Sequence, residues 1–94
     1  MTAEEGHDVQ LWCPENEKDL LVIWYRKSDA GSDRIVLKGE VQHDFADHMS
    51  FDKTSGNLTI HSAQLNDSGV YYCLVGFGEA HEIRLLVLGK YHLQ

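Results

Sequence analysis

The segment that most constrains this chain lies near its C-terminal end, where Asp67, Gly69, Tyr71 and Cys73 occupy alternate positions. Short apolar runs with the same period of two recur along the chain, and turn-forming residues separate them. Sustained helical periodicity is absent from the sequence. The pattern therefore predicts an all-β chain in which each strand buries one of its two sides.

Trp24 follows the only other cysteine, Cys13, and with this pair the C-terminal pattern resembles the immunoglobulin superfamily. The resemblance implies a two-sheet antiparallel sandwich, in which a disulfide between Cys13 and Cys73 crosses the core and the indole of Trp24 packs against it. It also implies a tyrosine corner, in which the hydroxyl of Tyr71 bonds to upstream backbone, and a tight turn at Gly69.

The alternation of apolar residues locates the strands of this sandwich. It predicts strands at residues 6–13, 21–27, 34–38, 40–43, 47–52, 57–61, 69–75 and 82–88. In the strand lettering of this family they correspond, in order, to B, C, C′, C″, D, E, F and G. Turn chemistry is expected at 29–31, 53–56 and 76–78, and a single helical turn fits residues 62–67. Besides the cysteines and Trp24, the residues expected to face the core are Val9, Leu11, Val22, Leu58, Ile60, Ile83, Leu85 and Val87.

Within the superfamily, the segments at residues 24–27, 34–43 and 50–60 resemble the variable type, or V-set. We expect a single V-like domain over residues 1–94, with its core at about 6–89, a tail at 90–94, and a C″ strand that is short or missing. The Phe-Gly-x-Gly motif of antigen receptors is not matched at Phe77, which argues against a rearranged antigen receptor.

One position departs from the V-set pattern. Variable domains usually pair the motif aspartate, here Asp67, with an arginine at the start of strand D, and His48 occupies the comparable position in this chain. A His48–Asp67 pair is one interpretation. A surface histidine without a special partner is another, and Lys53 is a third candidate to pair with Asp67.

Composition limits the partners and the compartment. The formal charge of −7, from 8 basic and 15 acidic residues, disfavours nucleic acid and anionic membrane surfaces, whose phosphates attract Lys and Arg. A structural disulfide forms in an oxidising compartment, so we expect an extracellular or lumenal domain. Residues 1–20 contain no apolar signal segment, and we expect the chain to be a piece of a longer secreted or membrane-anchored protein.

No pattern in the sequence predicts catalysis, a metal site or a cofactor. The 6 histidines are scattered, and no serine lies in a paired His/Asp signature. The Gly-x-Gly at 76–78 falls in a predicted hairpin rather than before a helix, which disfavours phosphate binding. We therefore expect a domain that is not an enzyme and that holds no cofactor.

Two N-glycosylation sequons are present, Asn57-Leu58-Thr59 and Asn66-Asp67-Ser68. Asn57 is out of phase with its inward neighbours, so it should face solvent beside the turn at 53–56. The aspartate in the middle of the second sequon weakens it. We expect sugar at Asn57 and little or none at Asn66.

The phase of the strands also predicts one exposed sheet face. If Trp24 and Cys73 point inward, their chain neighbours point outward on the same sheet, and the last strand adds two further residues. The resulting set is Ile23, Tyr25, Tyr72, Leu74, Arg84 and Leu86, with Phe77 at the neighbouring turn. An exposed cluster of aromatic and aliphatic side chains usually marks an interface, although neighbouring side chains can also cover it.

These observations lead to one main functional hypothesis. The chain is expected to be the extracellular recognition domain of an immune or adhesion receptor, binding a protein ligand, such as another immunoglobulin domain or a second copy, through its G-F-C-C′ face. A structural spacer in a multidomain protein is the alternative. An intracellular muscle-type module with reduced cysteines is a third interpretation, and the sequons argue against it.

Overall fold

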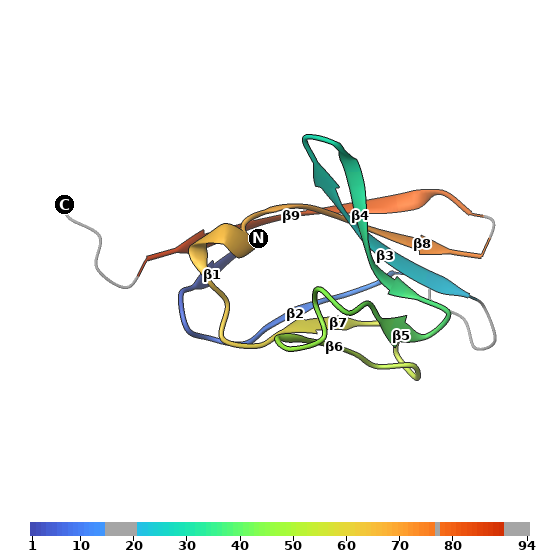
Figure 1. The fold of residues 1–94 in the computed structure, drawn as a ribbon, viewed down its shortest axis with the longest axis horizontal. Coiled ribbons are helices and arrows are strands. Elements are labelled where there is room, and N and C mark those ends of the chain that lie inside the picture. The colour runs from blue at the N-terminus through green and yellow to red at the C-terminus, as the bar shows by residue number, and fades with distance from the viewer. Residues whose placement is uncertain (15–20, 77, 90–94) are drawn as a thin grey trace.

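Runs of alternating apolar and polar residues form two facing β-sheets (Figure 1), and the computed structural model describes residues 1–14, 21–76 and 78–89. The larger sheet has the order β1 (Thr2–Glu4), β9 (Ala80–Leu88), β8 (Gly69–Val75), β3 (Val22–Ser28), β4 (Gly31–Leu37) and β5 (Glu40–Val41). The smaller sheet has the order β2 (Val9–Leu11), β7 (Leu58–Ile60) and β6 (Met49–Phe51). A 3-10 turn, η1 (Leu65–Asp67), precedes β8.

The two sheets bury their inner faces against each other, as the alternation predicted. The expected inward residues of β2, β3 and β7 are all buried, and on β9 Leu85 and Val87 are buried while Ile83 packs against the core. Trp24 is wholly buried, and its Nε1–H donates to the carbonyl of Gly56 at 2.8 Å, so its one polar atom has a partner.

The core motif of the sequence takes the positions that the family resemblance implied. A disulfide joins Cys13, beside β2, to Cys73 on β8, with a Cα–Cα distance of 5.7 Å, and so links the two sheets. The hydroxyl of Tyr71 donates to the carbonyl of Asp67, which forms the tyrosine corner. Gly69 has a packing reason as well, because a Cβ there would lie only 3.1 Å from Nε of Arg26.

Several strand bounds differ from those expected. β1 was not predicted; it pairs in parallel with β9, so the sheet extends N-terminal to residue 6. β4 begins at Gly31 instead of residue 34, and β9 begins at Ala80 instead of residue 82. The strands of the smaller sheet are shorter than predicted, while β5 is the short C″ strand that was expected.

The register between β3 and β4 shifts between Trp24 and Tyr25, which pair with Val36 and Arg34 respectively. The residue between these two partners, Ile35, is therefore an extra residue in the ladder. As a result Ile35 and Val36 are both wholly buried, although strict alternation would expose one of them. No helix in the described part of the chain is long and apolar enough to cross a membrane.

Candidate functional site

The outer face of the six-stranded sheet brings together the outward residues of its central strands. Registration of β3 with β8 sets Ile23 opposite Leu74 and Tyr25 opposite Tyr72. All four side chains are half-buried, while their chain neighbours Trp24 and Cys73 point into the core. We call this surface, together with Arg84 and Leu86 of β9, the outer face.

A stacked pair of tyrosines lies at the centre of the outer face. The rings of Tyr25 and Tyr72 have centroids 5.0 Å apart and an interplanar angle of 17°. Stacking of this kind stabilises aromatic pairs beyond the area that they bury. The pair therefore presents a flat and pre-ordered aromatic surface to a partner.

Charged groups of β9 border the tyrosine pair. The hydroxyl of Tyr72 donates to Oε1 of Glu82 at 3.3 Å, and Nε of Arg84 donates to Oε2 of Glu82 at 2.8 Å. The hydrogen bond from Arg84 holds the pKa of Glu82 below its usual value, and partial burial beside Glu82 raises the pKa of Tyr72. Glu82 thereby links the hydroxyl of Tyr72 to the guanidinium of Arg84 at the edge of the tyrosine pair.

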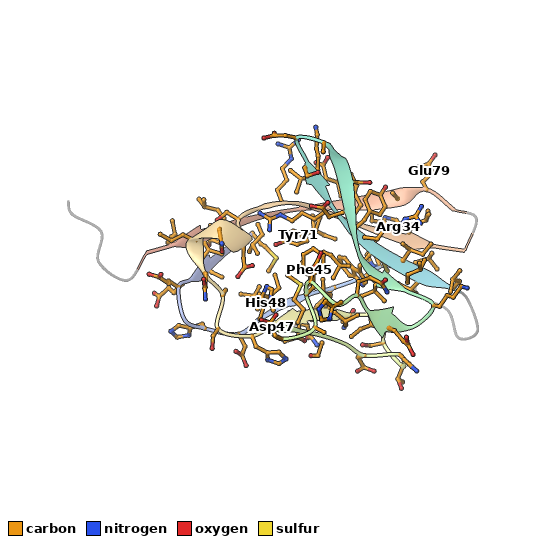
Figure 2. All side chains as sticks on the ribbon, viewed as in Figure 1. Arg34, Phe45, Asp47, His48, Tyr71 and Glu79 are labelled. Atoms are coloured by element: carbon orange, nitrogen blue, oxygen red, sulfur yellow. A yellow bond between two sulfur atoms is a disulfide. The ribbon has the colours of Figure 1, made fainter. Side chains whose placement is uncertain are left out.

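The remaining predicted members of the outer face lie farther along the sheet. Leu86 is 52% exposed, and its register partner is Thr2 of β1. Phe77, the aromatic residue predicted at the turn, lies outside the described residues. The sequence did not point to Glu82, although its outward phase two residues before Arg84 could have revealed it. It also did not point to Arg34 on β4 (labelled in Figure 2), which is the register partner of Tyr25.

A second polar cluster holds the turn before β8. Nη2 of Arg26 donates to two backbone carbonyls, those of Asn66 and Ser68, each at 2.7 Å. These two residues flank Asp67. The guanidinium of Arg26 also lies over the ring of Tyr71, 5.5 Å from its centroid. The same phase that buries Trp24 points Arg26 inward, and this was the signal that could have identified it.

The structure decides among the candidate partners of Asp67. Nε2 of His48 lies 3.5 Å from Oδ1 of the buried Asp67 carboxylate, and Nδ1 of His48 lies 3.0 Å from Oδ1 of Asp47. Lys53 instead extends along Gly39. The other Asp67 oxygen, Oδ2, accepts from the backbone N–H of Gln64 at 2.8 Å.

This cluster borders a surface hollow between η1 and the β5–β6 connection, and Arg26, His48 and Asp67 belong to its lining. Figure 2 shows Phe45, Asp47 and His48 on that connection, below Tyr71. Nη2 of Arg26 donates to backbone carbonyls, and the two oxygens of Asp67 contact the backbone N–H of Gln64 and the ring of His48. The cluster therefore acts on the fold of the turn, and the described residues contain no group of three or more His, Cys, Asp or Glu that could hold a metal.

One side-chain arrangement was not expected from the sequence. Oγ of Ser50 lies 2.8 Å from Nε2 of His61, and Nδ1 of His61 lies 3.5 Å from Oδ2 of Asp8. Ser50, His61 and Asp8 thus follow one another as the nucleophile, base and acid of a catalytic triad do. All three side chains, however, are exposed on the outer surface of the smaller sheet. Oδ1 of Asp8 also accepts from the backbone of Ser62, so this row ties β2, β6 and β7 together.

The glycosylation sequons differ in their surroundings. Asn57 is half-buried rather than fully directed to solvent, because its Oδ1 accepts from the backbone N–H of Cys13 at 3.0 Å. Asn66 is exposed in η1, and the hydroxyl of Ser68 in its sequon accepts from the backbone N–H of Val87 at 2.8 Å.

Comparison with known proteins identifies the family. The model of the immunoglobulin V-set domain matches residues 1–88. T cell receptor beta variable 3-1 of Homo sapiens is 32% identical over 68 residues, which are 72% of this chain and 56% of that protein. The chain thus spans about half the length of this relative.

Solved structures agree with this assignment. The first immunoglobulin-like domain of the human CD48 antigen is 25% identical and has a TM-score of 0.79, with 100% of this chain and 84% of that chain covered. The CD2-binding domain of CD58 is 20% identical and has a TM-score of 0.72, with 93% and 52% covered, a likeness that shows the fold alone. The chain belongs to the immunoglobulin V-set family.

Proposed function

We propose that this V-set domain is an extracellular recognition module of an immune or adhesion receptor and that it binds another protein through its outer face. The observation that carries the proposal is the stacked Tyr25–Tyr72 pair at the centre of that face. Tyrosine and arginine are favoured anchors at protein interfaces, and a pre-ordered ring loses little conformational freedom on binding. The proposed function is binding, and it includes no catalytic step.

The surroundings of the pair support an interface. Arg84 and Glu82 form a charged rim and are joined by a hydrogen bond, and Leu86 adds an exposed aliphatic side chain farther along the same face. An apolar centre with a polar rim is the usual anatomy of a protein-binding surface. One fold neighbour is the CD2-binding domain of CD58, so a sandwich of this architecture can serve protein binding.

The charge of the chain favours a different protein over a second copy. Two chains with a formal charge of −7 each repel one another during approach. A partner with a basic contact surface is instead steered toward the domain. We therefore assign the outer face to a heterophilic protein partner, most simply another immunoglobulin-type ectodomain, and self-association becomes an outcome that the experiment detects.

The compartment and the parent protein follow from the same proposal. The disulfide between Cys13 and Cys73 and the receptor relative support an extracellular domain. The parent protein is then anchored to the cell surface by a segment outside residues 1–94.

The test begins with the domain secreted from animal cells and presented as a tetramer to an array of purified receptor ectodomains. For the ectodomain that binds, titrations are repeated with Tyr72→Ala and with Tyr72→Phe. We expect Tyr72→Ala to weaken binding at least about tenfold, because a central aromatic anchor is lost. Tyr72→Phe keeps the ring that stacks on Tyr25 and should bind within about threefold of the parent.

Sedimentation of the isolated domain over a range of concentrations provides the second arm. A monomer at all concentrations agrees with a heterophilic partner. If the domain self-associates and Tyr72→Ala abolishes this association, the outer face is still the interface, but the partner is a second copy of the chain. If no ectodomain binds and the domain stays monomeric, the spacer interpretation replaces the proposal.

A further inference from the structure

The smaller sheet carries an unusually exposed aromatic side chain on its outer surface. Trp12, which follows β2, is 71% exposed, the largest exposed fraction among the large hydrophobic residues described. Its Nε1–H donates to Oε1 of Gln10 at 3.1 Å, so the indole lies along the sheet rather than away from it. A large aromatic face that remains open to water marks a surface that contacts something.

The strand register sets Trp12 beside the first glycosylation sequon. The β2–β7 ladder ends with Leu11 opposite Leu58, and Trp12 and Asn57 are the residues that directly follow and precede these two partners. Just beyond the ladder, the Asn57 side chain accepts from the backbone N–H of Cys13 at 3.0 Å, which places it beside the residue next to Trp12. Leu11 and Leu58 are buried, and their neighbours therefore share the outer surface of the smaller sheet. Directly opposed side chains on one face of an antiparallel pair lie close enough to interact.

The Asn57 side chain makes a hydrogen bond that is compatible with a glycan on its amide nitrogen. Its Oδ1 accepts from the backbone N–H of Cys13, which fixes the side chain and leaves Nδ2, the atom to which a glycan is joined. The glycosylated amide keeps its carbonyl oxygen, so this hydrogen bond persists after modification. Thr59, the third residue of the sequon, lies on the same surface and is only half-buried.

We propose that Asn57 carries an N-linked glycan whose first N-acetylglucosamine packs on the indole of Trp12. In the transfer step, Nδ2 attacks the anomeric carbon of a lipid-pyrophosphate-linked oligosaccharide. The bond from that carbon to the pyrophosphate oxygen breaks, the lipid pyrophosphate leaves with the electron pair, and one Nδ2 proton passes to a base of the transferase. The C–H groups on one face of the sugar then cover the negative face of the indole.

The second sequon lacks these features. Its middle residue, Asp67, is buried, and its carboxylate accepts from the backbone N–H of Gln64. The hydroxyl oxygen of Ser68 accepts from the backbone N–H of Val87. The glycan at Asn57 would also stand on the sheet opposite to the outer face (Figure 1), and it would leave that face open to a partner. The contact rests on Trp12 and Asn57 alone, whereas addition of the sugar rests on the extracellular location in the proposed function. Expression as a secreted protein tests the contact whether or not the outer face binds a partner.

The experiment uses two substitutions at one position. Thr59→Val removes the sequon hydroxyl while it preserves the shape of the side chain, and Thr59→Ser retains the sequon as the matched control. Asn57→Gln is less suitable, because it also removes the hydrogen bond to Cys13. Peptide mapping of protein secreted from animal cells should find sugar at residue 57 in the parent and in Thr59→Ser, and none there in Thr59→Val.

Acrylamide quenching of tryptophan fluorescence then tests the contact. Trp24 is wholly buried, so quenching reports on Trp12. The quenching constant should fall by at least about half on glycosylation, because the stacked sugar covers the indole face that is open to solvent. Trimming the glycan to its first N-acetylglucosamine should preserve this protection, and Thr59→Val should lack it.

Thermal melts give an independent readout. The glycosylated parent should melt about 4 °C above Thr59→Val, and the same comparison in a Trp12→Ala background should show no difference. An unmodified Asn57 in the secreted parent would overturn the proposal. Sugar at Asn57 that leaves both the quenching of Trp12 and the melting difference unchanged would overturn the contact.

Discussion

At the scale of single residues, Arg26 shows how one side chain organises a turn. Its guanidinium binds the carbonyls of Asn66 and Ser68, lies over the ring of Tyr71, and occupies the space that a side chain at position 69 would fill. The sequence predicted the disulfide, Trp24 and the tyrosine corner because those residue types recur as a motif. It did not predict the contacts of Arg26, because a strand position gives the direction of a side chain but not its partners.

The buried hydroxyl of Tyr71 makes alkaline stability a residue-scale prediction. Burial raises the pKa of Tyr71 from 10.0 to about 12 in the folded protein. A raised folded pKa means that the contribution to the free energy of unfolding is complete below pH 10 and is lost as the pH rises through about 12. The loss across this window should amount to about 2–3 kcal/mol.

Urea unfolding between neutral pH and pH 12 measures this effect. Tyr71→Phe should lower the free energy of unfolding at neutral pH by about 1–3 kcal/mol, because the bond to the Asp67 carbonyl is lost. Its stability should then fall less steeply than that of the parent above pH 10. Tyr72→Phe is the surface control. Equal slopes for the parent and Tyr71→Phe would show that this hydroxyl is not the group that titrates.

At the scale of elements, the β3–β4 pair contains the main irregularity of the fold. The extra residue between the partners of Trp24 and Tyr25 buries Ile35 and Val36 side by side. The bulge also changes which β4 residue faces outward beside the tyrosine pair, and it sets Arg34 opposite Tyr25. The composition of the outer face therefore depends on this one register shift.

The bulge predicts unequal effects of two neighbouring substitutions. Ile35→Ala should lower the free energy of unfolding by about 2–5 kcal/mol, because it opens a cavity in the core. Arg34→Ala removes an exposed side chain and should change it by no more than about 0.5 kcal/mol. Chemical denaturation of both variants is the measurement. Similar losses for the two variants would contradict the register.

The prediction of elements from sequence succeeded where burial imposes a period of two, as in β3, β7 and β8. It missed β1 (Thr2–Glu4), whose residues are mostly polar and whose pairing with β9 is not local in sequence. It also started β4 too late, because Gly31, Ser32 and Asp33 are exposed and carry no apolar signal. The outward direction of the site residues on β3 and β8 was predicted from the alternation of apolar and polar residues. The bulge that places Arg34 opposite Tyr25 was not predicted, because the alternation is interrupted where the register shifts.

At the scale of the whole molecule, two sheets of different size are joined through the core by one disulfide, with a sequence separation of 60 residues. The six-stranded sheet presents the stacked tyrosines, and the three-stranded sheet presents Trp12 and Asn57. The two outer surfaces are thereby assigned different roles, one to a protein partner and the other to a glycan.

The disulfide makes a prediction at this scale. The double substitution Cys13→Ala and Cys73→Ala should lower the free energy of unfolding by about 2–5 kcal/mol, because the unfolded chain regains the freedom of a long loop. Guanidinium titrations of the parent and the variant measure the difference. Free thiols at both positions in the natively secreted parent would refute the bridge.

The most direct test of the central claim compares one exposed aromatic residue from each sheet. Tyr72→Ala and Trp12→Ala are titrated against the same receptor ectodomain, with thermal melts as a control for folding. We expect Tyr72→Ala to weaken binding at least about tenfold and Trp12→Ala to bind within about twofold of the parent. A loss of binding in Trp12→Ala alone, with Tyr72→Ala folded and unaffected, would contradict the assignment of the outer face.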